Sequence, residues 1–226
     1  KDEIYTEDDN IIILGDDGCN FFNDKRDKYT KQIISKLPST FYMVRGNHAM
    51  RPQNVKGMEL VYDEAVGGEV YMESEYPNIK YFKDFGIYYI DGKSVAVIGG
   101  AYSVDKWYRI QCGWTWWEDE QLSDAERDEC YKMMGWKSFD VVLSHTCPYK
   151  WRPVDKFLAQ IDQSQVDTTM ERFLEALEEN ICYRVWLFGH YHDDRIEAPH
   201  AEMFFKDTEK LDSILERWDN YEKGDK

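Results

Sequence analysis

Four short apolar runs in this chain each end in a turn that carries residues able to bind metals. The last of them, Val185–His192, reads Val-Trp-Leu-Phe-Gly-His-Tyr-His. A buried strand that runs into a tight glycine turn can bring two imidazoles to one point at the edge of a sheet, as a metal centre requires. The three other runs end in Gly-Asp, Gly-Asn-His and Ser-His. Because the pattern recurs at four strand ends, we interpret these residues as one shared site rather than as isolated core or surface histidines.

The apolar runs themselves predict strands that are covered on both faces. They are the stretches Asn10–Gly15, Thr40–Arg45, Phe139–Leu143 and Val185–Phe188. Between the first two, a helix that ends before Pro38 is predicted by apolar residues at helical spacing, namely Tyr29, Ile33, Ile34 and Leu37. A strand, a helix and a strand in this order indicate that the first two strands are parallel neighbours.

The middle of the chain departs from this strand-helix rhythm. Short strands are predicted at Glu69–Met72 and Ile79–Phe82, and Gly86–Ile90 and Ser94–Ile98 read as a hairpin. The pair Asp91-Gly92 between the hairpin strands favours a tight type I′ turn. Because a hairpin breaks the alternation of strands and helices, we expect a second sheet.

The last third of the chain predicts two capped helices and a final strand and helix. Ser123 with Glu126, and Thr168 with Glu171, have the spacing of capping boxes, and the first helix is expected to end near Gly135. Apolar faces are predicted on the second of these helices (Met170, Phe173, Leu174, Leu177) and on a charged terminal helix (Leu211, Ile214, Leu215, Trp218) that follows a strand at Met203–Phe205.

The stretch Gly99–Glu120 reads as a long loop without regular structure. Its aromatic residues are Tyr102, Trp107, Tyr108, Trp114, Trp116 and Trp117. Long loops in compact domains are usually functional lids or binding segments, so this loop is one candidate for covering a site. The alternative is that the rings simply cover a sheet.

Length and hydrophobicity limit the class of protein. With 226 residues, of which 42% are hydrophobic, the chain can form a sizeable core, and we expect one domain over residues 1–226. The longest aliphatic run, Ile11–Leu14, is far too short to cross a bilayer, and residues 1–10 contain no signal-like apolar segment. Five scattered cysteines without a Cys-x-x-Cys spacing favour reduced thiols and a cytoplasmic location over a disulfide framework.

Charge restricts the partners. The formal net charge is −16, from 28 basic and 44 acidic residues, and a field of that sign repels a long nucleic acid. A small or medium phosphate ester remains compatible, because bound divalent cations would reverse the sign locally. The sequence favours no particular oligomeric state.

The predicted strand ends supply a mixed set of metal ligands. These residues are Asp16, Asn47 with His48, His145, and His190 with His192. Open α/β sheets form their sites at the carboxyl ends of strands, so we expect these side chains to lie together. Carboxylate, amide oxygen and imidazole suit manganese, iron or zinc. Two ions bridged by Asp16 would form the kind of clamp that serves phosphoryl transfer.

The order Gly15-Asp16, Gly46-Asn47-His48, His145, Gly189-His190-Tyr191-His192 resembles the calcineurin-like metallophosphoesterase superfamily over nearly the whole chain. The resemblance implies an α/β fold, a four-layer α-β-β-α sandwich of two mixed β-sheets flanked by helices. It also implies that Asp16 bridges two metals, that Asn47, His145 and His190 complete the second ion, and that His192 binds the first. His48 would lie against the scissile phosphate and stabilise or protonate the leaving oxygen.

Three departures from the family pattern affect these expectations. The family begins with an Asp-x-His motif on its first strand, and no Asp-x-His occurs in this chain. We therefore expect that the domain as given lacks the first strand and helix of the family, and with them two ligands of the first metal. Cys19 stands where a second aspartate is common, and Ala49 where an acid usually follows Gly-Asn-His; lost carboxylates could loosen Asp16 or retune His48.

These residues predict a metal-dependent phosphoesterase that acts on a phosphate mono- or diester. A metal-bridging hydroxide would attack phosphorus at a dinuclear centre, and His48 would assist departure of the leaving group. Arg51, Arg109 and Lys106 are candidates for holding the substrate phosphate. Alternatively, these three cations are ordinary solvated surface charges.

Two other functions remain open from the sequence. A catalytically impaired member of the same fold could serve as a protein-interaction scaffold, as the missing Asp-x-His and the many tryptophans suggest. A nuclease or cyclic-nucleotide diesterase is the other alternative, and the net charge of −16 disfavours long nucleic acids but not small diesters.

Overall fold

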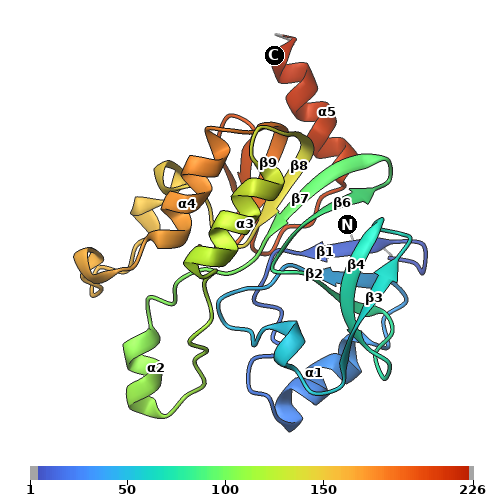
Figure 1. Ribbon diagram of the computed structural model, residues 1–226, viewed down its shortest axis with the longest axis vertical. Coiled ribbons are helices and arrows are strands. Elements are labelled where there is room, and N and C mark those ends of the chain that lie inside the picture. The colour runs from blue at the N-terminus through green and yellow to red at the C-terminus, as the bar shows by residue number, and fades with distance from the viewer. Residues whose placement is uncertain (1–4, 224–226) are drawn as a thin grey trace.

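Two mixed β-sheets form the centre of the computed structural model, which describes residues 5–223 (Figure 1). The five-stranded sheet has the order β1-β2-β5-β4-β3 and consists of Asn10–Ile13 (β1), Thr40–Met43 (β2), Met58–Asp63 (β3), Gly68–Glu73 (β4) and Ile79–Phe82 (β5). The six-stranded sheet has the order β10-β11-β9-β8-β7-β6 and consists of Phe85–Ile90 (β6), Lys93–Ile98 (β7), Ser138–Ser144 (β8), Cys182–Phe188 (β9), Arg195–Ala198 (β10) and Ala201–Met203 (β11).

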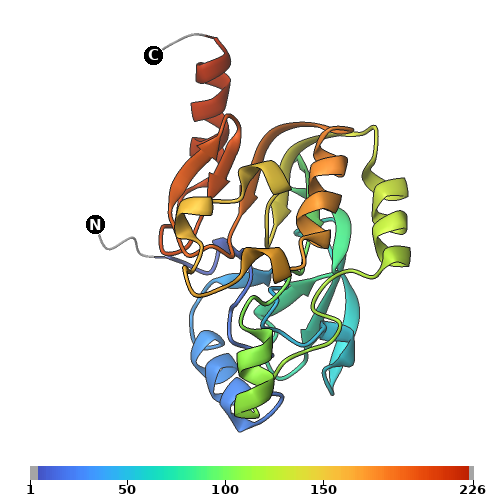
Figure 2. The ribbon, with the colours of Figure 1, turned by 90° about the vertical axis from the view of Figure 1, so that its left-hand side faces the viewer.

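Five helices lie around the two sheets in the part of the chain that the structure describes. They are Lys25–Ile34 (α1), Lys106–Cys112 (α2), Asp124–Met134 (α3), Thr169–Glu178 (α4) and Leu211–Glu222 (α5), with short 3₁₀ turns at Pro52–Asn54, Tyr149–Trp151, Val154–Lys156 and Gln163–Gln165. In Figures 1 and 2, α3 and α4 lie on the six-stranded sheet, α1 lies below the five-stranded sheet and α5 extends from the opposite end of the molecule. The predicted four-layer sandwich of two mixed sheets is thus confirmed. Among the described residues, no helix has the length and apolar character needed to span a membrane.

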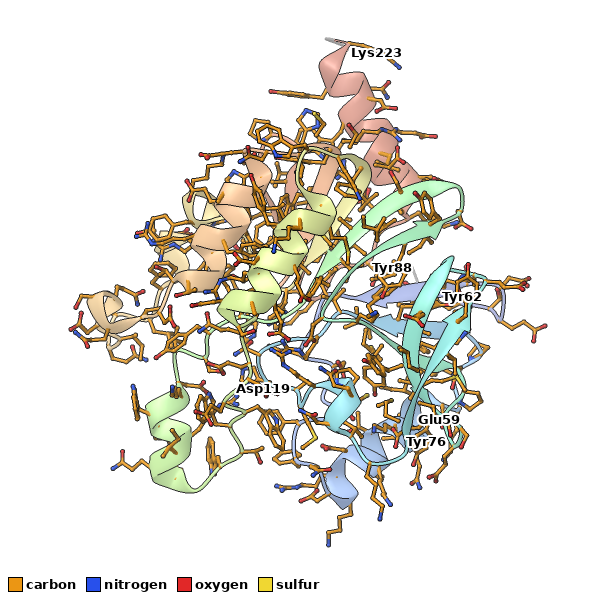
Figure 3. All side chains as sticks on the ribbon, viewed as in Figure 1. Glu59, Tyr62, Tyr76, Tyr88, Asp119 and Lys223 are labelled. Carbon is orange, nitrogen blue, oxygen red and sulfur yellow. The ribbon has the colours of Figure 1, made fainter. Side chains whose placement is uncertain are left out.

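Successive side chains along a strand point to opposite faces of the sheet, so the core is divided into layers. On β7, Val95 and Val97 face the five-stranded sheet, whereas Ala96 and Ile98 belong to the cluster under α3 and α4. Tyr88, labelled in Figure 3, is 2% exposed and lies between the sheets. Each sheet is therefore apolar on both faces, which explains why several strands read as continuous apolar runs in the sequence.

The predicted connections between strands are also present. β1 and β2 are parallel neighbours joined through α1, with Ile11 opposite Phe41. β6 and β7 form the expected hairpin, and Asp91 and Gly92 both have positive φ angles, 49° and 74°, as a type I′ turn requires. The chain therefore enters the second sheet through this hairpin.

The apolar face predicted for α1 is wrong at three of its four residues, because of these only Ile34 is half-buried, against the outer cluster of the five-stranded sheet. Tyr29 and Ile33 are 66% and 48% exposed, and Leu37 beyond the helix is 47% exposed. The buried helical positions are instead Asp27 and Lys31, one turn apart. The Asp27 carboxylate accepts hydrogen bonds from backbone N–H groups that precede the helix, and Lys31 forms an ion pair with Glu73 of β4. Polar pairing, which periodicity of apolar residues does not reveal, therefore orients this helix.

Three other expectations are corrected. The stretch Gly99–Glu120 is not structureless, because it contains α2. The last strand is Ala201–Met203, and Phe205 lies outside it with an exposed side chain, where the Asp194 carboxylate accepts hydrogen bonds from the backbone N–H of Phe205 and its neighbour. The strand within Asn10–Gly15 is only partly buried, because β1 is the edge of its sheet.

The free edge of β1 borders a cleft of about 750 Å³. Its apolar lining comes from both sheets and from α5, and includes Ile12, Leu14, Val141, Leu143, Leu187 and Ile214. Asp16, His145 and His190 line the same cleft, near the carboxyl end of β1. The unpaired edge of β1, an edge strand, is therefore exposed to this cleft.

The two predicted capping boxes have different outcomes. At α3, the Ser123 hydroxyl accepts the backbone N–H of Glu126 and the Glu126 carboxylate accepts the backbone N–H of Ser123, so this box is confirmed. At α4, the Thr168 side chain makes no capping bond, and the capping box is wrong. The Asp167 carboxylate binds the backbone N–H of Thr169 instead.

We expect Ser123→Ala to lower the free energy of unfolding by about 1 kcal/mol, because the first turn of α3 loses its side-chain acceptor. Thr168→Ala is the matched comparison, and it should change stability by less, because no cap is removed. Urea denaturation followed by circular dichroism measures both values. Equal losses in the two variants would contradict this account of the helix starts.

Candidate metal centre

The carboxyl ends of β1, β2, β8 and β9 meet where the two sheets come closest. The backbone N–H of Gly100, just after β7, donates to the carbonyl of Arg45, just after β2, at 2.7 Å, and so ties the sheets together. Asp16, His145 and His190 lie at this junction, and each offers a ligand atom within 4.8 Å of the others. These three residues form a group that could hold a metal ion.

Two glycines allow this close approach. Gly15 has a φ angle of 103°, and a Cβ at this position would overlap the ring of His145. A Cβ at Gly46 would overlap the carboxylate and the backbone nitrogen of Asp16. The glycines that precede the polar residues are therefore needed for space as well as for turning the chain.

The ligand residues themselves have unusual backbone conformations. Asp16, His190 and His192 have φ angles of 55°, 70° and 57°, in the left-handed region that side chains with a Cβ rarely adopt. Such conformations cost free energy and are concentrated at functional sites. The tight turns after β1 and β9 thus set the directions of these three side chains.

His145 is the most buried member of the group, at 1% exposure. Its Nδ1 lies 2.7 Å from the carbonyl oxygen of Leu14, which can only accept, so Nδ1 carries the proton. Nε2 then carries the lone pair of the ring. This nitrogen lies 2.9 Å from Oδ1 of Asn47 and 3.3 Å from Nδ1 of His190.

Burial and the neighbouring His145 lower the pKa of His190 to about 3. The imidazole of His190 is therefore neutral at pH 7 and keeps a lone pair for a ligand. The carboxylate of Asp16 completes the group, with Oδ2 3.6 Å from Nε2 of His145.

The atoms that converge here fit a divalent cation. An amide oxygen and an imidazole nitrogen that each present a lone pair to the other at 2.9 Å have no hydrogen to share. A cation between them removes that repulsion, and the mixture of carboxylate, amide oxygen and imidazole suits manganese, iron or zinc. Asp16, Asn47, His145 and His190 are the residues that would hold it.

His192 is not brought into this group. Its ring is exposed and stacks on Phe205, with centroids 4.7 Å apart and planes at 20°. It lines the cleft beside β1 together with Asp16 and His190. The structure therefore separates the two histidines of the Gly-His-Tyr-His turn, with His190 inside the group and His192 at the cleft.

His48 stands beside Asp16, with its Nε2 3.8 Å from Oδ2 of Asp16. Phe21 stacks on its ring, with centroids 5.6 Å apart. Arg109 of α2 reaches the same imidazole, with Nη2 3.1 Å from Nε2. Because a guanidinium only donates, Nε2 of His48 accepts this bond and the proton of the neutral ring lies on Nδ1. Arg109 is thus the predicted substrate-binding cation that lies beside the site, although it is buried and its Nε also pairs with Asp105 at 2.8 Å.

The other two predicted cations are engaged elsewhere. The Lys106 ammonium lies 4.1 Å from the ring centroid of Trp116. Arg51 is buried, and its Nη1 pairs with Asp84 at 2.9 Å and with the carboxylate of Glu126. Its remaining nitrogens donate to carbonyl oxygens of residues 119 and 121, so the guanidinium joins α3 to the segment that precedes it. Asp119, labelled in Figure 3, lies in this segment as it returns from α2.

Sequence reasoning missed several neighbours of the site. Ser103 accepts the side-chain N–H of Asn47 at 2.8 Å, and Glu120 in turn contacts Ser103. Phe21 supports His48 from the turn after β1. No spacing links these residues to the strand ends. The only sequence signal was the concentration of aromatic residues between Gly99 and Glu120, which marked the segment but not its polar members.

A comparison with known protein families matches a family model described as calcineurin-like phosphoesterase to residues 2–194. The matched region contains every predicted ligand from Asp16 to His192. No curated protein matches the chain.

The contacts of Glu126 predict a pH effect on stability. Burial acts to raise its pKa, but hydrogen bonds from Arg51 and Ser123 dominate and lower it to about 2. A carboxyl with a depressed folded pKa stabilises the protein above its unfolded pKa, near 4.5, and this contribution is lost as the pH falls towards 2. Glu126→Gln should therefore be less stable than wild type at pH 7 and should lose less stability between pH 4.5 and 2. Denaturant unfolding across this range, with the exposed Glu129→Gln as the comparison, measures the difference.

A second prediction concerns Gly46. In Gly46→Ala the added methyl displaces Asp16, so we expect binding of Mn²⁺ to weaken by about 10-fold or more while the fold is retained. Gly86→Ala, where the added methyl meets the ring of Tyr88 rather than a predicted metal ligand, controls for crowding at a glycine. Isothermal titration calorimetry measures the affinity. Unchanged Mn²⁺ binding in Gly46→Ala would show that Asp16 does not contribute as described.

Proposed function

The chain belongs to the calcineurin-like phosphoesterase family, and we propose that it hydrolyses a phosphate mono- or diester with two divalent metal ions. Family membership supports a metal-dependent phosphoesterase in general. One observation carries the specific proposal: lone pairs on Oδ1 of Asn47 and Nε2 of His145 face each other at 2.9 Å without a hydrogen to share, beside Asp16 and His190.

Manganese, iron or zinc bound here would lower the pKa of a nucleophilic water and neutralise charge on the phosphoryl oxygens. The protein residues hold these groups in place. Asp16 lies between the ligand group and His48, with Oδ2 3.6 Å from Nε2 of His145 and 3.8 Å from Nε2 of His48, and it would be the ligand shared between two ions. Its Oδ1 also accepts the backbone N–H of His48 at 3.3 Å, which couples the carboxylate to the Gly-Asn-His turn.

His48 and Arg109 would act on the substrate rather than on the metals. Arg109 donates to Nε2 of His48, so the imidazole presents its Nδ1–H to other partners. We assign to His48, whose Nε2 faces Asp16, the hydrogen bond to the leaving oxygen when substrate takes the place of the Arg109 contact. The Arg109 guanidinium adds a positive charge beside the imidazole, where the phosphate of a small or medium ester would lie. Phe21 stacks on His48 and limits its rotation.

The first ion of a dinuclear centre needs more ligands than Asp16 and His192 provide. The cleft along β1 ends at both residues, and its lining is apolar on the side of the sheets. An extended segment that runs parallel to β1 in this cleft would bring its carboxyl end beside Asp16 and His192. We propose that such a segment, carrying the expected Asp-x-His motif, supplies the remaining ligands.

A second candidate function is that of a protein-interaction scaffold. The observation that favours it is the exposure of aromatic residues in and after α2, where Trp107, Tyr108 and Trp114 are 68%, 58% and 58% exposed. Exposed aromatic side chains are common in binding interfaces. The scaffold requires no turnover, so activity measurements separate it from the enzyme.

The test is hydrolysis of p-nitrophenyl phosphate and bis(p-nitrophenyl) phosphate with added Mn²⁺. We expect turnover that a chelator removes, and His48→Ala should lower kcat by about 10²- to 10⁴-fold because the hydrogen bond to the leaving group is lost. His200→Gln, at the turn between β10 and β11, is the control and should keep the wild-type kcat. Equal rates for wild type and His48→Ala, or no turnover with either ester, would contradict the proposed hydrolysis.

A further inference from the structure

Glu120 is a buried carboxylate at the base of the segment that carries α2. It is 2% exposed. Its Oε1 accepts the backbone N–H of Ser103 at 3.0 Å, and its Oε2 accepts the Ser103 hydroxyl at 2.6 Å and the indole N–H of Trp116 at 2.8 Å. Ser103 precedes α2 and Trp116 follows it, so this one carboxylate joins both ends of the segment from which Arg109 extends.

The bond to Glu120 decides the direction of the hydrogen bond between Ser103 and Asn47. A serine hydroxyl has one hydrogen, and the carboxylate, 2.6 Å away, is the stronger acceptor. Oγ of Ser103 can then only accept, and it does so from Nδ2 of Asn47 at 2.8 Å. With its amino group held by Ser103, the amide of Asn47 turns Oδ1 towards Nε2 of His145.

Without Glu120 the opposite orientation would be favoured. A flipped Asn47 amide would donate from its amino group to the lone pair on Nε2 of His145, and its oxygen would accept the hydrogen of Ser103. Both bonds would then be satisfied with no metal present. The flipped amide cannot bind a cation, because an amide nitrogen has no lone pair to offer. The direction of one serine hydrogen therefore separates a metal-binding from a non-binding Asn47.

We propose that Glu120 is a positioning residue that acts through Ser103 to hold the Asn47 oxygen towards the metal centre. This inference rests on the proposed function, since it assigns Asn47 as a ligand. Glu120 also holds Trp116, so the base of the α2 segment and the orientation of Asn47 depend on the same carboxylate. The segment that carries Arg109 is in this way connected to the metal site.

The first test is Mn²⁺ affinity of the full chain by isothermal titration calorimetry. Ser103→Ala and Glu120→Ala should each weaken binding by about 10- to 100-fold, the usual effect of removing a group that orients a metal ligand. Ser94→Ala is the matched control, because Ser94 binds the Asp140 carboxylate through both its N–H and its hydroxyl, each at 2.9 Å, but at the opposite end of β7. If the substitutions acted only by loss of packing or hydrogen bonding, the melting temperature of all three variants would fall, and the site variants would bind Mn²⁺ with the same affinity as Ser94→Ala.

A double-mutant cycle tests whether the two residues act in series. Ser103→Ala combined with Glu120→Ala should bind Mn²⁺ no more weakly than Ser103→Ala alone, because Glu120 has no route to Asn47 once the hydroxyl is gone. Glu120→Gln keeps one oxygen for the hydroxyl hydrogen and should lose less affinity than Glu120→Ala. Wild-type affinity in Ser103→Ala, or losses that add in the double variant, would overturn the proposal.

A second measurement does not depend on metal binding. In metal-free protein, the ¹⁵N resonance of His145 Nε2 reports whether this nitrogen accepts a hydrogen bond. We expect Ser103→Ala and Glu120→Ala to shift this resonance, because Asn47 flips and donates to it, and Ser94→Ala to leave it unchanged. An unshifted resonance in both site variants would overturn the positioning role. Shifted resonances together with no Mn²⁺ binding by wild type would instead contradict the proposed function and leave the orientation of Asn47 by Glu120 supported.

Discussion

The hydrogen bond from Nδ1 of His145 to the carbonyl of Leu14 is the interaction on which the rest of the site depends. It joins β8 of one sheet to the end of β1 in the other at 2.7 Å. The same bond assigns the ring proton to Nδ1 and so directs the lone pair of Nε2 towards Asn47 and His190. Gly15 permits this contact because any Cβ there would overlap the imidazole. Sheet packing and ligand chemistry are therefore set by one polar contact.

Around this contact, each polar group is oriented by a partner that is itself fixed. Asn47 is held by Ser103, and His48 contacts both Phe21 and Arg109. These supporting residues come from the turn after β1 and from the segment around α2, not from the sheets. The strand ends bring the ligand atoms together, and the surrounding loops determine how those atoms are presented. Metal sites commonly have this arrangement, in which residues that do not bind the metal orient the residues that do.

Sequence patterns predicted the central strands and their ends, because continuous apolar runs and glycine turns are local signals, but they missed the edge strands β3 and β10, which are less apolar. They failed where long-range polar contacts decide the outcome. The helix α1 buries Asp27 and Lys31 rather than Tyr29 and Ile33, since Lys31 finds Glu73 on a distant strand. Arg51, two residues beyond the Gly-Asn-His-Ala turn, was predicted to hold substrate, yet carboxylates of residues 84 and 126 surround it. No local pattern reveals a partner that lies 33 or more residues away.

By itself the sequence determined the order and chemistry of the ligands: an aspartate, an asparagine and histidines, each placed after a strand by a glycine or serine turn. Each of these residues follows directly on an apolar run, so local sequence is enough to place it at a strand end. Tertiary structure alone decided which of the paired histidines joins the group, since the turn directs His190 inward and leaves His192 against Phe205. It also decided whether the oxygen or the nitrogen of the Asn47 amide faces His145, because Ser103 and Glu120 set that orientation. These two residues are distant from Asn47 in the sequence, and the packing of the α2 segment brings them near.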